Sequence, residues 1–245
     1  MFERVERFVR DVAAVNDEGA LTAALDAITG ELGFRYYALT HHVDPRGRGL
    51  ALRLHNYPDG WERFFDERGL ATIDPVHRAS HQTSIGFAWS DLDQLIRLTE
   101  ADLEVLALAR SVGIGEGFTI PAHVPGDAHG SCSFAMATGD AIRADHLALA
   151  QLVGAFAFEA ARRMWRQHNF PLPAARMTDR QRECLMWCAR GKSDWEIARI
   201  LGISHETVIR HLKQARERYG VTKRTQLAIH ALFDGTIAFI DVFRR

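Results

Sequence analysis

Cysteine is scarce in this sequence. The 245 residues include three, and so small and odd a number excludes a disulfide framework. Cys184 and Cys188 are one helical turn apart, but no second pair of Cys or His residues follows at a zinc-ligand spacing. We therefore interpret all three cysteines as small buried hydrophobic residues, and we expect no metal site and no cofactor.

Long apolar runs are also missing. Residues 1–30 alternate charged and apolar side chains and lack the apolar block of a signal peptide. The longest uncharged run, Ala148–Phe158 with Leu147 before it, is too short to span a bilayer. The sequence therefore predicts a cytoplasmic protein without a membrane partner.

The chain has almost no net charge, −1 in total, which by itself argues against a nucleic-acid partner. The two parts of the chain differ, however. Residues 1–175 contain 16 Lys and Arg against 23 Asp and Glu, whereas residues 176–245 contain 14 against 8. An acidic front part and a basic back part indicate separate roles, with nucleic acid as the natural partner of the basic part.

The basic part contains a helix-turn-helix pattern between Met177 and Gly235. Three helix starts are marked by capping residues, which are Thr178 with Gln181, Ser193 with Glu196, and Ser204. Gly191 ends the first helix, and Gly202 provides the tight turn between the second and third. A short helix, a turn with glycine and a longer basic helix is the arrangement that places one helix in the DNA major groove.

The helix that follows Ser204 is the predicted reading helix. Four residues at helical spacing should face the core: Val208, Leu212, Ala215 and Tyr219. The opposite face carries the candidate DNA contacts Glu206, Ile209, Arg210, Lys213 and Arg216. Four flanking residues are further candidate DNA contacts: Lys192, Ser193, Lys223 and Arg224. The basic ones among them suit phosphate groups. The alternative is a solvated basic helix in a generic helical bundle.

The front part mixes edge helices with strands that are linked by hairpins. Helices are predicted at Phe2–Val15, at a following segment with apolar residues at helical spacing that ends at Gly33, and at Thr99–Val112. Thr99 and Asp102 form a cap pair at the start of the last of these helices. Strands are predicted at 34–43, 50–55, 85–89, 117–122 and 130–138, with turns at 44–47 and 125–127. We predict an α+β chain, with an α/β/α sandwich around an antiparallel sheet followed by an all-α helix-turn-helix domain of four helices.

The longest helical pattern, Ile142–Arg166, is apolar nearly all round at its centre and must be covered on two sides. Its own sheet covers one side. We favour a second copy of the chain for the other, with a glutamate at Val153 as the test; burial wholly within the domain is the alternative. Pro171 and Pro173 then keep an extended linker. The predicted domains are 1–166, a linker at 167–176, and 177–245.

Aromatic and polar side chains are concentrated between residues 57 and 89. Tyr57, Trp61 and Phe65 lie four apart and would share one face of a helix. The Tyr and Trp rings carry donors, and Asp74 is an acceptor whose backbone is restricted by the Pro75 that follows. Such a set suits a small amphiphile with an amide and a carbonyl, although aromatic residues at this spacing are more often core.

The front part contains the motifs Asn56-Tyr57-Pro58 with Trp61, Asp74-Pro75-Val76, Trp89, Gly113-Ile114, Phe118–Pro121 and Gly130–Ser133. At these residues it resembles the autoinducer-binding domain of LuxR-type quorum-sensing regulators, and the resemblance extends along nearly the whole chain. The back part resembles their DNA-binding domain at Thr178, Leu185, Trp187, Gly191-Lys192, Glu196–Ala198, Ile203-Ser204, Thr207-Val208 and His211. The motifs of the back part are shared with many response regulators. The spacing of Tyr57, Trp61, Asp74-Pro75 and Trp89 in the front part is more selective for this family.

This resemblance implies a homodimer that binds an N-acyl-homoserine lactone and double-stranded operator DNA, with RNA polymerase as a further candidate partner. Trp61 would donate to the lactone carbonyl and Asp74 would accept from the ligand amide. Tyr57 and Ser133 would bind the amide-side carbonyl, while Val76 and Trp89 would form the wall of the pocket. Ligand binding would then be coupled to folding.

The chain departs from the family pattern at two positions. Phe65 replaces the usual Tyr, which removes one pocket hydroxyl, and Gln181 replaces the usual Glu, which removes a carboxylate but keeps a capping side chain. In addition, His41, His42, Arg53 and His55 lie on neighbouring strands. If one of them enters the pocket, a polar or aryl acyl group is expected; otherwise they face solvent or pair with surface acids.

Two other functions compete with this interpretation. One is a regulator of the same family that responds to a non-lactone or host-derived molecule, or that is active without a ligand. The other is an enzyme built on Asp74 and His77 with His41 and His42. No ligand motif matches that spacing and no nucleophile lies in an elbow, so we expect no catalysis.

Overall fold

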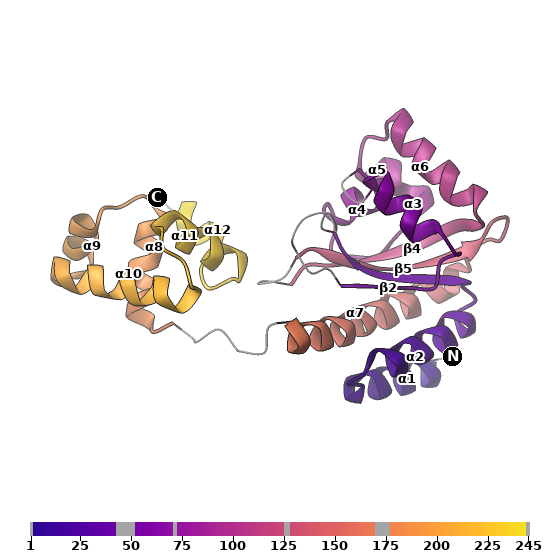
Figure 1. Cartoon of the computed structure of the whole chain (residues 1–245), viewed down its shortest axis with the longest axis horizontal. Coiled ribbons are helices and arrows are strands. Elements are labelled where there is room, and N and C mark those ends of the chain that lie inside the picture. Colours follow the sequence, from indigo (N-terminus) through magenta and orange to yellow (C-terminus); the bar gives the residue numbers. More distant parts are fainter. Residues whose placement is uncertain (1, 43–51, 71–72, 125–127, 170–176, 244–245) are drawn as a thin grey trace. The chain divides into compact units, whose positions relative to one another are not determined.

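The computed structural model describes residues 2–42, 52–70, 73–124, 128–169 and 177–243 (Figure 1). The chain forms two compact units, and the first gives way to the second within the predicted linker 167–176. Helix α7 (Leu147–Asn169) continues beyond Arg166, so the first residues assigned to that linker are helical instead.

The first unit contains one antiparallel sheet with the strand order β2-β1-β5-β4-β3. Its strands are β1 (Tyr36–His41), β2 (Arg53–His55), β3 (Phe87–Ala88), β4 (Ile114–Ala122) and β5 (Gly130–Ala137). All five lie within or overlap the predicted strands. The predicted turns at 44–47 and 125–127, and the start of the 50–55 strand, lie outside the described residues.

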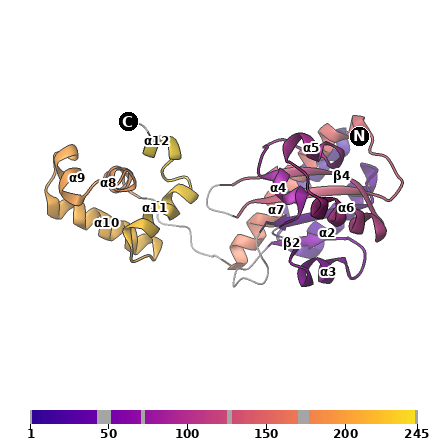
Figure 2. The same cartoon turned by 90° about the horizontal axis from the view of Figure 1, so that it is seen from above.

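Helices cover both faces of the sheet, as predicted for a sandwich (Figure 1). On one face lie α1 (Phe2–Ala14), α2 (Glu18–Glu31) and α7. On the other lie α3 (Trp61–Glu67), α4 (Pro75–Ser80), α5 (Leu92–Leu95) and α6 (Glu100–Ser111), and Figure 2 shows α3, α4 and α6 spread across the sheet from above. Thr99 and Asp102 form the predicted capping box at the start of α6.

The alternation of side chains along β5 separates the main core from a second, smaller cluster. Cys132 and Phe134 are fully buried in the core beneath α1, α2 and α7. Ala135 points to the opposite face and packs in a cluster with Trp61 of α3. Because successive side chains of a strand alternate between faces, Ser133 shares the face of Ala135. The helices α3 to α6 therefore enclose a polar as well as an apolar part of the sheet.

The predicted helix Ile142–Arg166 begins later than expected. A 3-10 turn at Ala144–His146 precedes α7, and the His146 Nδ1 lies 2.7 Å from the carbonyl oxygen of Leu32. This tertiary hydrogen bond holds the turn, and local sequence could not reveal it. Val153 was the wrong position for a test of dimerisation because its side chain is fully buried in the domain core. Leu152 and Phe156 of the same helix are exposed instead.

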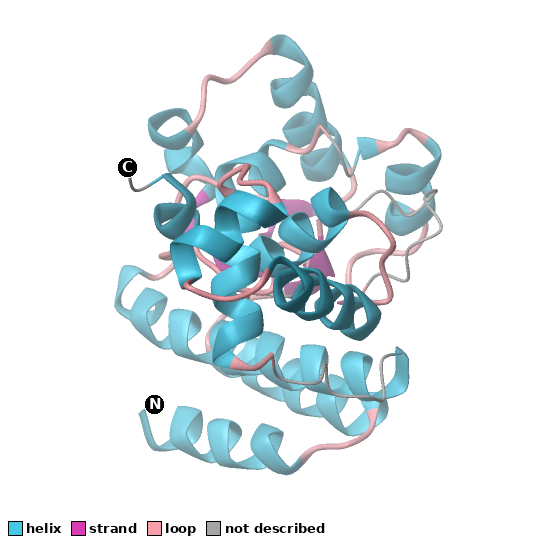
Figure 3. Cartoon of the chain, turned by 90° about the vertical axis from the view of Figure 1, so that its left-hand side faces the viewer, coloured by secondary structure: helices cyan, strands magenta, loops and turns pink. Residues whose placement is uncertain are grey.

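The second unit consists of helices and loops in the part of it that is described (Figure 3). Its helices are α8 (Asp179–Ala189), α9 (Asp194–Leu201), α10 (His205–Tyr219), α11 (Arg224–Phe233) and α12 (Phe239–Phe243). The predicted capping boxes begin α8 and α9, and Ser204 caps α10. Gly191 and Gly202 adopt positive φ angles of 80° and 65°, which explains glycine at both helix ends. The four-helix prediction was one helix short, because α12 adds a short fifth.

Two expectations from the sequence concern the cysteines and membrane-spanning helices. Cys132, Cys184 and Cys188 are all free and buried, as predicted. Across the described parts of the chain, no helix has both the length and the apolar surface that a membrane crossing requires.

Candidate functional site

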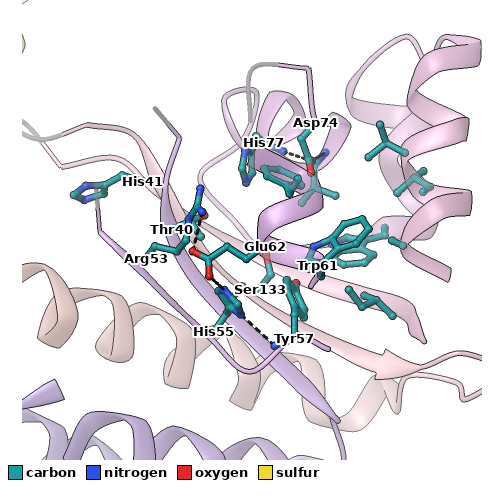
Figure 4. Close-up of a pocket in the computed structure, with 18 residues that line it drawn as sticks. Thr40, His41, Arg53, His55, Tyr57, Trp61, Glu62, Asp74, His77 and Ser133 are labelled. Carbon is teal, nitrogen blue, oxygen red and sulfur yellow. Dashed lines mark hydrogen bonds and ion pairs between the residues drawn. The ribbon is translucent and has the colours of Figure 1, made fainter. Parts of the chain in front are cut away.

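A cavity of about 90 Å³ lies between the sheet and helices α3, α4 and α6 (Figure 4). The seven residues predicted to bind a ligand all line it: Tyr57, Trp61, Phe65, Asp74, Val76, Trp89 and Ser133. The secondary structure that positions these residues differs from the prediction in one respect. Helix α3 begins at Trp61, so Tyr57 lies in the preceding turn and does not share a helical face with Trp61 and Phe65.

Asp74 is held in place by the helix that it caps. Its Oδ1 accepts hydrogen bonds from the backbone N–H of Val76 at 2.7 Å and of His77 at 3.1 Å. Pro75 occupies the first helical position, where a missing N–H costs nothing. The other carboxylate oxygen has no hydrogen-bond partner among the described residues. Asp74 therefore presents one fixed, unused acceptor at the cavity wall.

Trp89 and Ser133 are joined by a third residue that the sequence did not single out, Thr119. The indole N–H of Trp89 donates to Thr119 Oγ1 at 2.8 Å, and that oxygen lies 2.8 Å from Ser133 Oγ. Because an indole can only donate, Thr119 accepts from it and can give its own proton to Ser133. The Ser133 proton is then available to a ligand, and Trp89 does more than form a wall.

Glycine at position 117 makes room for the Trp89 ring. A Cβ placed on Gly117 would lie 2.4 Å from the indole, closer than side chains approach one another. The strand β4 thus carries both the acceptor for Trp89 and the gap in which its ring lies.

The aromatic donors at the other end of the cavity are also unused. The Trp61 indole N–H and the Tyr57 hydroxyl have no hydrogen-bond partner in the part of the chain that is described. Burial, and after it the negative charge of Asp74, raises the pKa of Tyr57 above its usual value. The hydroxyl therefore remains a donor at neutral pH. Phe65 lies 6.1 Å from the Trp61 ring and contributes only apolar surface.

Polar side chains from the sheet, α3 and α4 complete the cavity. Those that sequence reasoning did not assign to a ligand are Thr40, His41, Arg53, His55, Glu62 and His77. The two alternatives for the strand residues both hold in part. Arg53 lines the cavity and also pairs with the acids Glu62 and Asp66. His41 and His55 line the cavity as well, whereas His42 does not belong to its lining.

His42 instead belongs to a cluster of histidines beside the cavity, made of His42, His77, His81, His123 and His129. His42 stacks on His77 with ring centres 4.0 Å apart, and its Nδ1 lies 3.1 Å from Nε2 of His81. The ring of His129 lies 4.7 Å from both His81 and His123. Burial, followed by the charges of these neighbours, lowers the pKa of His42 well below its usual value. Among the described residues, no three side chains are arranged to hold a metal ion.

In the second unit, α10 has the predicted two faces. Val208, Leu212 and Ala215 are buried against α8 and α9. The candidate reading residues Glu206, Ile209, Arg210 and Lys213 are exposed, and Arg216 is half-buried. The helix therefore presents a mixed charged and apolar surface of the kind that enters a major groove.

The residues that flank α10 divide into two groups. Lys192 is half-buried and pairs with Glu196 at 3.3 Å, whereas Lys223 is exposed. Ser193 caps α9. Arg224 donates to the Lys192 carbonyl at 2.8 Å and lies 3.4 Å from Asp194. Arg224 thus joins α11 to the start of α9, a structural role beside the phosphate contact that the sequence predicted.

In α8, Gln181 occupies the position where the family pattern has a glutamate, and its contacts show how the second unit folds without that carboxylate. The residue is buried; its Oε1 accepts from the backbone of Thr178 at 3.1 Å, and its Nε2 donates to Gln214 of α10 at 3.0 Å. A neutral amide therefore joins the first helix to the reading helix without an ion pair.

The comparisons with known proteins assign both units. Residues 17–164 match the family model of the autoinducer binding domain, and residues 175–231 match that of bacterial regulatory proteins of the luxR family. The transcriptional activator protein VanR of Vibrio anguillarum is 27% identical over 237 residues, which are 96% of this chain and 98% of that protein. The HTH-type quorum sensing-dependent transcriptional regulator RpaR of Rhodopseudomonas palustris is 32% identical over 220 residues, covering 89% and 88%.

A solved structure agrees along nearly the whole chain. The crystal structure of Escherichia coli SdiA matches with a TM-score of 0.73 and 25% identity, and it covers 97% of this chain and 99% of that one. The sandwich and the helical unit therefore occur together in a known protein.

Proposed function

Because the chain belongs to the luxR family of bacterial regulatory proteins with an autoinducer-binding domain, we propose that it binds an N-acyl-homoserine lactone and, as a dimer, palindromic operator DNA. The family and the named relatives make it a quorum-sensing transcriptional regulator and not an enzyme. We further propose that it acts in the cytoplasm, with RNA polymerase as an additional candidate partner.

The observation that carries the ligand assignment is the set of unused polar atoms around one apolar cavity. Trp61 offers an N–H for the lactone carbonyl, and Asp74 offers an oxygen for the ligand amide N–H. Tyr57 and Ser133 offer hydroxyl protons for the amide-side carbonyl. An acyl-homoserine lactone has this combination of two carbonyls and one amide donor, so each polar group of its head would be paired.

The remaining wall is suited to an acyl chain. Its apolar lining comes from α3, α4, α6 and β4, namely Phe65, Val76, Val105, Leu106, Ala109 and Ile114. Each methylene removed from water by this wall would stabilise the complex by about 0.8 kcal/mol.

Asp74→Asn tests the site with little disturbance of the fold. Asparagine keeps the side-chain oxygen that caps α4 but replaces the free acceptor with an N–H₂ donor. We expect the variant to express and melt like the parent without ligand, and to lose the rise in melting temperature that lactones give the parent. Asp93→Asn, which changes an exposed acid of α5, is the matched control. An undiminished lactone response in Asp74→Asn would refute the assignment.

The DNA contacts are tested by Arg210→Ala with Lys213→Ala. Both side chains are exposed on α10, so their removal should leave lactone binding intact and abolish operator binding at moderate salt. Arg7→Ala with Arg63→Ala removes the same charge from the first unit and should leave operator binding unchanged. Retention of operator binding in the α10 double variant would exclude this reading face.

A further inference from the structure

The histidine cluster beside the cavity connects helix α4 to the sheet. His77 lies in α4, and His81 is its C-cap residue. The other three lie next to strand ends: His42 follows β1, His123 follows β4 and His129 precedes β5. The backbone N–H of His42 also donates to the carbonyl oxygen of His129 at 2.7 Å. The cluster therefore brings α4 into contact with the ends of three strands.

His42 is at the centre of these contacts. Its Nε2 lies 2.9 Å from Ser131 Oγ, and its Nδ1 lies 3.1 Å from Nε2 of His81. A hydrogen bond between two ring nitrogens requires that one of them carry no proton. If both rings were fully protonated, two N–H groups would face each other across this distance. The bond between α4 and the end of β1 therefore forms only while His42 or His81 is neutral.

Charge neighbours make protonation of the cluster unfavourable. Burial, and after it the charges of the other four histidines, lowers the pKa of His42, and no carboxylate is among these causes. Burial and then neighbouring histidines also lower the pKa values of His81 and His129. Arg78 of α4 pairs with Asp102 of α6 at 2.6 Å, so the acid of α6 is already matched by a base. The described residues thus favour an uncharged cluster.

The same short helix carries part of the ligand site. Asp74 caps α4 and presents its free oxygen to the cavity, and Val76 and His77 line the cavity. The His77 ring lies between the two sites, because it stacks on His42 at 4.0 Å and meets Phe65 of α3 edge-on at 6.0 Å. Figure 4 shows His77 beside Asp74. A displacement of α4 from the strand ends would therefore move Asp74 away from a bound ligand.

We propose that the histidine cluster makes ligand binding sensitive to pH, because protons that enter it release α4 from the strand ends and weaken binding at Asp74. His81, His123 and His129 are exposed, so protons reach the cluster without passing through the cavity. The inference rests on the proposed function, since the ligand is the lactone of the same site. Protons and lactone then compete, because the lactone binds only the form with α4 in place.

The direction of the effect follows from linkage between the two kinds of binding. The lowered pKa values show that the cluster takes up protons less readily with α4 in place than histidines do in water, so acid favours the released form. Lactone binding must then expel protons, and each proton expelled weakens the apparent affinity by up to about tenfold per pH unit. The affinity should be constant above about pH 6.5 and decrease below that value.

The test measures the dissociation constant of octanoyl-homoserine lactone for the full chain by titration calorimetry between about pH 7.5 and about pH 5.5. Neither the amide nor the lactone of this probe titrates in that range, so a change reports on the protein. We expect the Kd to rise about tenfold between pH 6.5 and pH 5.5, the value for one proton expelled. The binding enthalpy near pH 6 should also depend on the ionisation enthalpy of the buffer, which takes up the expelled proton.

His81→Gln and His42→Gln each remove one titrating ring of the bonded pair and keep a polar side chain. Both variants should bind the lactone like the parent near pH 7 and lose most of the pH dependence. His205→Gln is the matched control, because His205 is an exposed residue of α10 in the second unit, and it should behave like the parent. Circular dichroism at each pH identifies the range in which the chain is folded.

A parent Kd that does not change with pH within the folded range would overturn the proposal. A change that persists in both His81→Gln and His42→Gln would overturn it as well, since the titrating group would then lie elsewhere. If the lactone does not bind near pH 7, the proposed function fails and the pH control with it. If it binds there, is lost in Asp74→Asn and shows no pH dependence, only the pH control fails.

Discussion

Replacing Thr119 by valine removes one hydroxyl from a fully buried position and keeps the shape of the side chain. The lost oxygen accepts from the Trp89 indole and contacts Ser133 Oγ, both at 2.8 Å. Each such hydrogen bond contributes about 1 kcal/mol net, so the variant should lose about 2 kcal/mol of stability. For a domain of this size that loss lowers the melting temperature by roughly 4–8 °C.

The same change should weaken lactone binding, because it frees the Trp89 ring and the Ser133 hydroxyl to turn away from their places at the cavity. Thr119→Ser keeps the hydroxyl and should retain most of the ligand response. Scanning calorimetry with and without lactone measures both effects. A Thr119→Val protein that melts like the parent, with the parent's lactone response, would refute a role for Thr119 in positioning Trp89 and Ser133.

Two further predictions concern acid and self-association. Burial and mutual charge lower the pKa values of His42, His81 and His129 from the ordinary 6.5, so the unfolded chain binds more protons below that value. The free energy of unfolding should therefore be highest above about pH 6.5 and should decrease as the pH drops below that value. His42→Gln should make this decrease smaller. Equal melting temperatures at pH 5 and pH 7 would contradict the prediction. We propose the groove between α1 and α7 as the dimer contact; it is lined by Val5 and Val9 and bordered by the exposed side chains of Phe2, Leu152 and Phe156. Leu152→Glu with Phe156→Glu should therefore give monomers by light scattering, and an intact dimer would point to another surface.

Local signals in the sequence predicted local structure well. The capping pairs Thr99 with Asp102, Thr178 with Gln181, and Ser193 with Glu196 each close within one helical turn, and all three form as predicted. The two faces of α10 follow from helical spacing alone. Such features need no knowledge of distant residues, which is why the helix-turn-helix unit was predicted almost completely.

Features that depend on distant partners were predicted less well. Thr119 pairs with Trp89 thirty positions earlier, and only the pairing of β3, β4 and β5 brings them together with Ser133. Likewise, Arg53 was recognised as a strand residue, but its pairing with Asp66 depends on how α3 folds back over β2. The late start of α7 has the same cause, because it depends on the contact of His146 with Leu32.

The cavity residues themselves came largely from the family resemblance. From spacing alone, Tyr57, Trp61 and Phe65 would share one face if the segment were helical, but the helix begins only at Trp61. Residue chemistry already suggested Asp74 as an acceptor; the resemblance added Ser133 and the wall roles of Val76 and Trp89, and the structure gathers all of them around one cavity. For the strand residues His41, Arg53 and His55, the sequence left open whether they enter the cavity, and the structure shows that all three line it.

We propose that the cavity binds an acyl-homoserine lactone. The most direct measurement is mass spectrometry of what co-purifies with the full chain after co-expression with a panel of lactones, for the parent and for Asp74→Asn. We expect one acyl-homoserine lactone bound to the parent and none bound to Asp74→Asn. An empty cavity, or a molecule without a lactone and an amide, would contradict it.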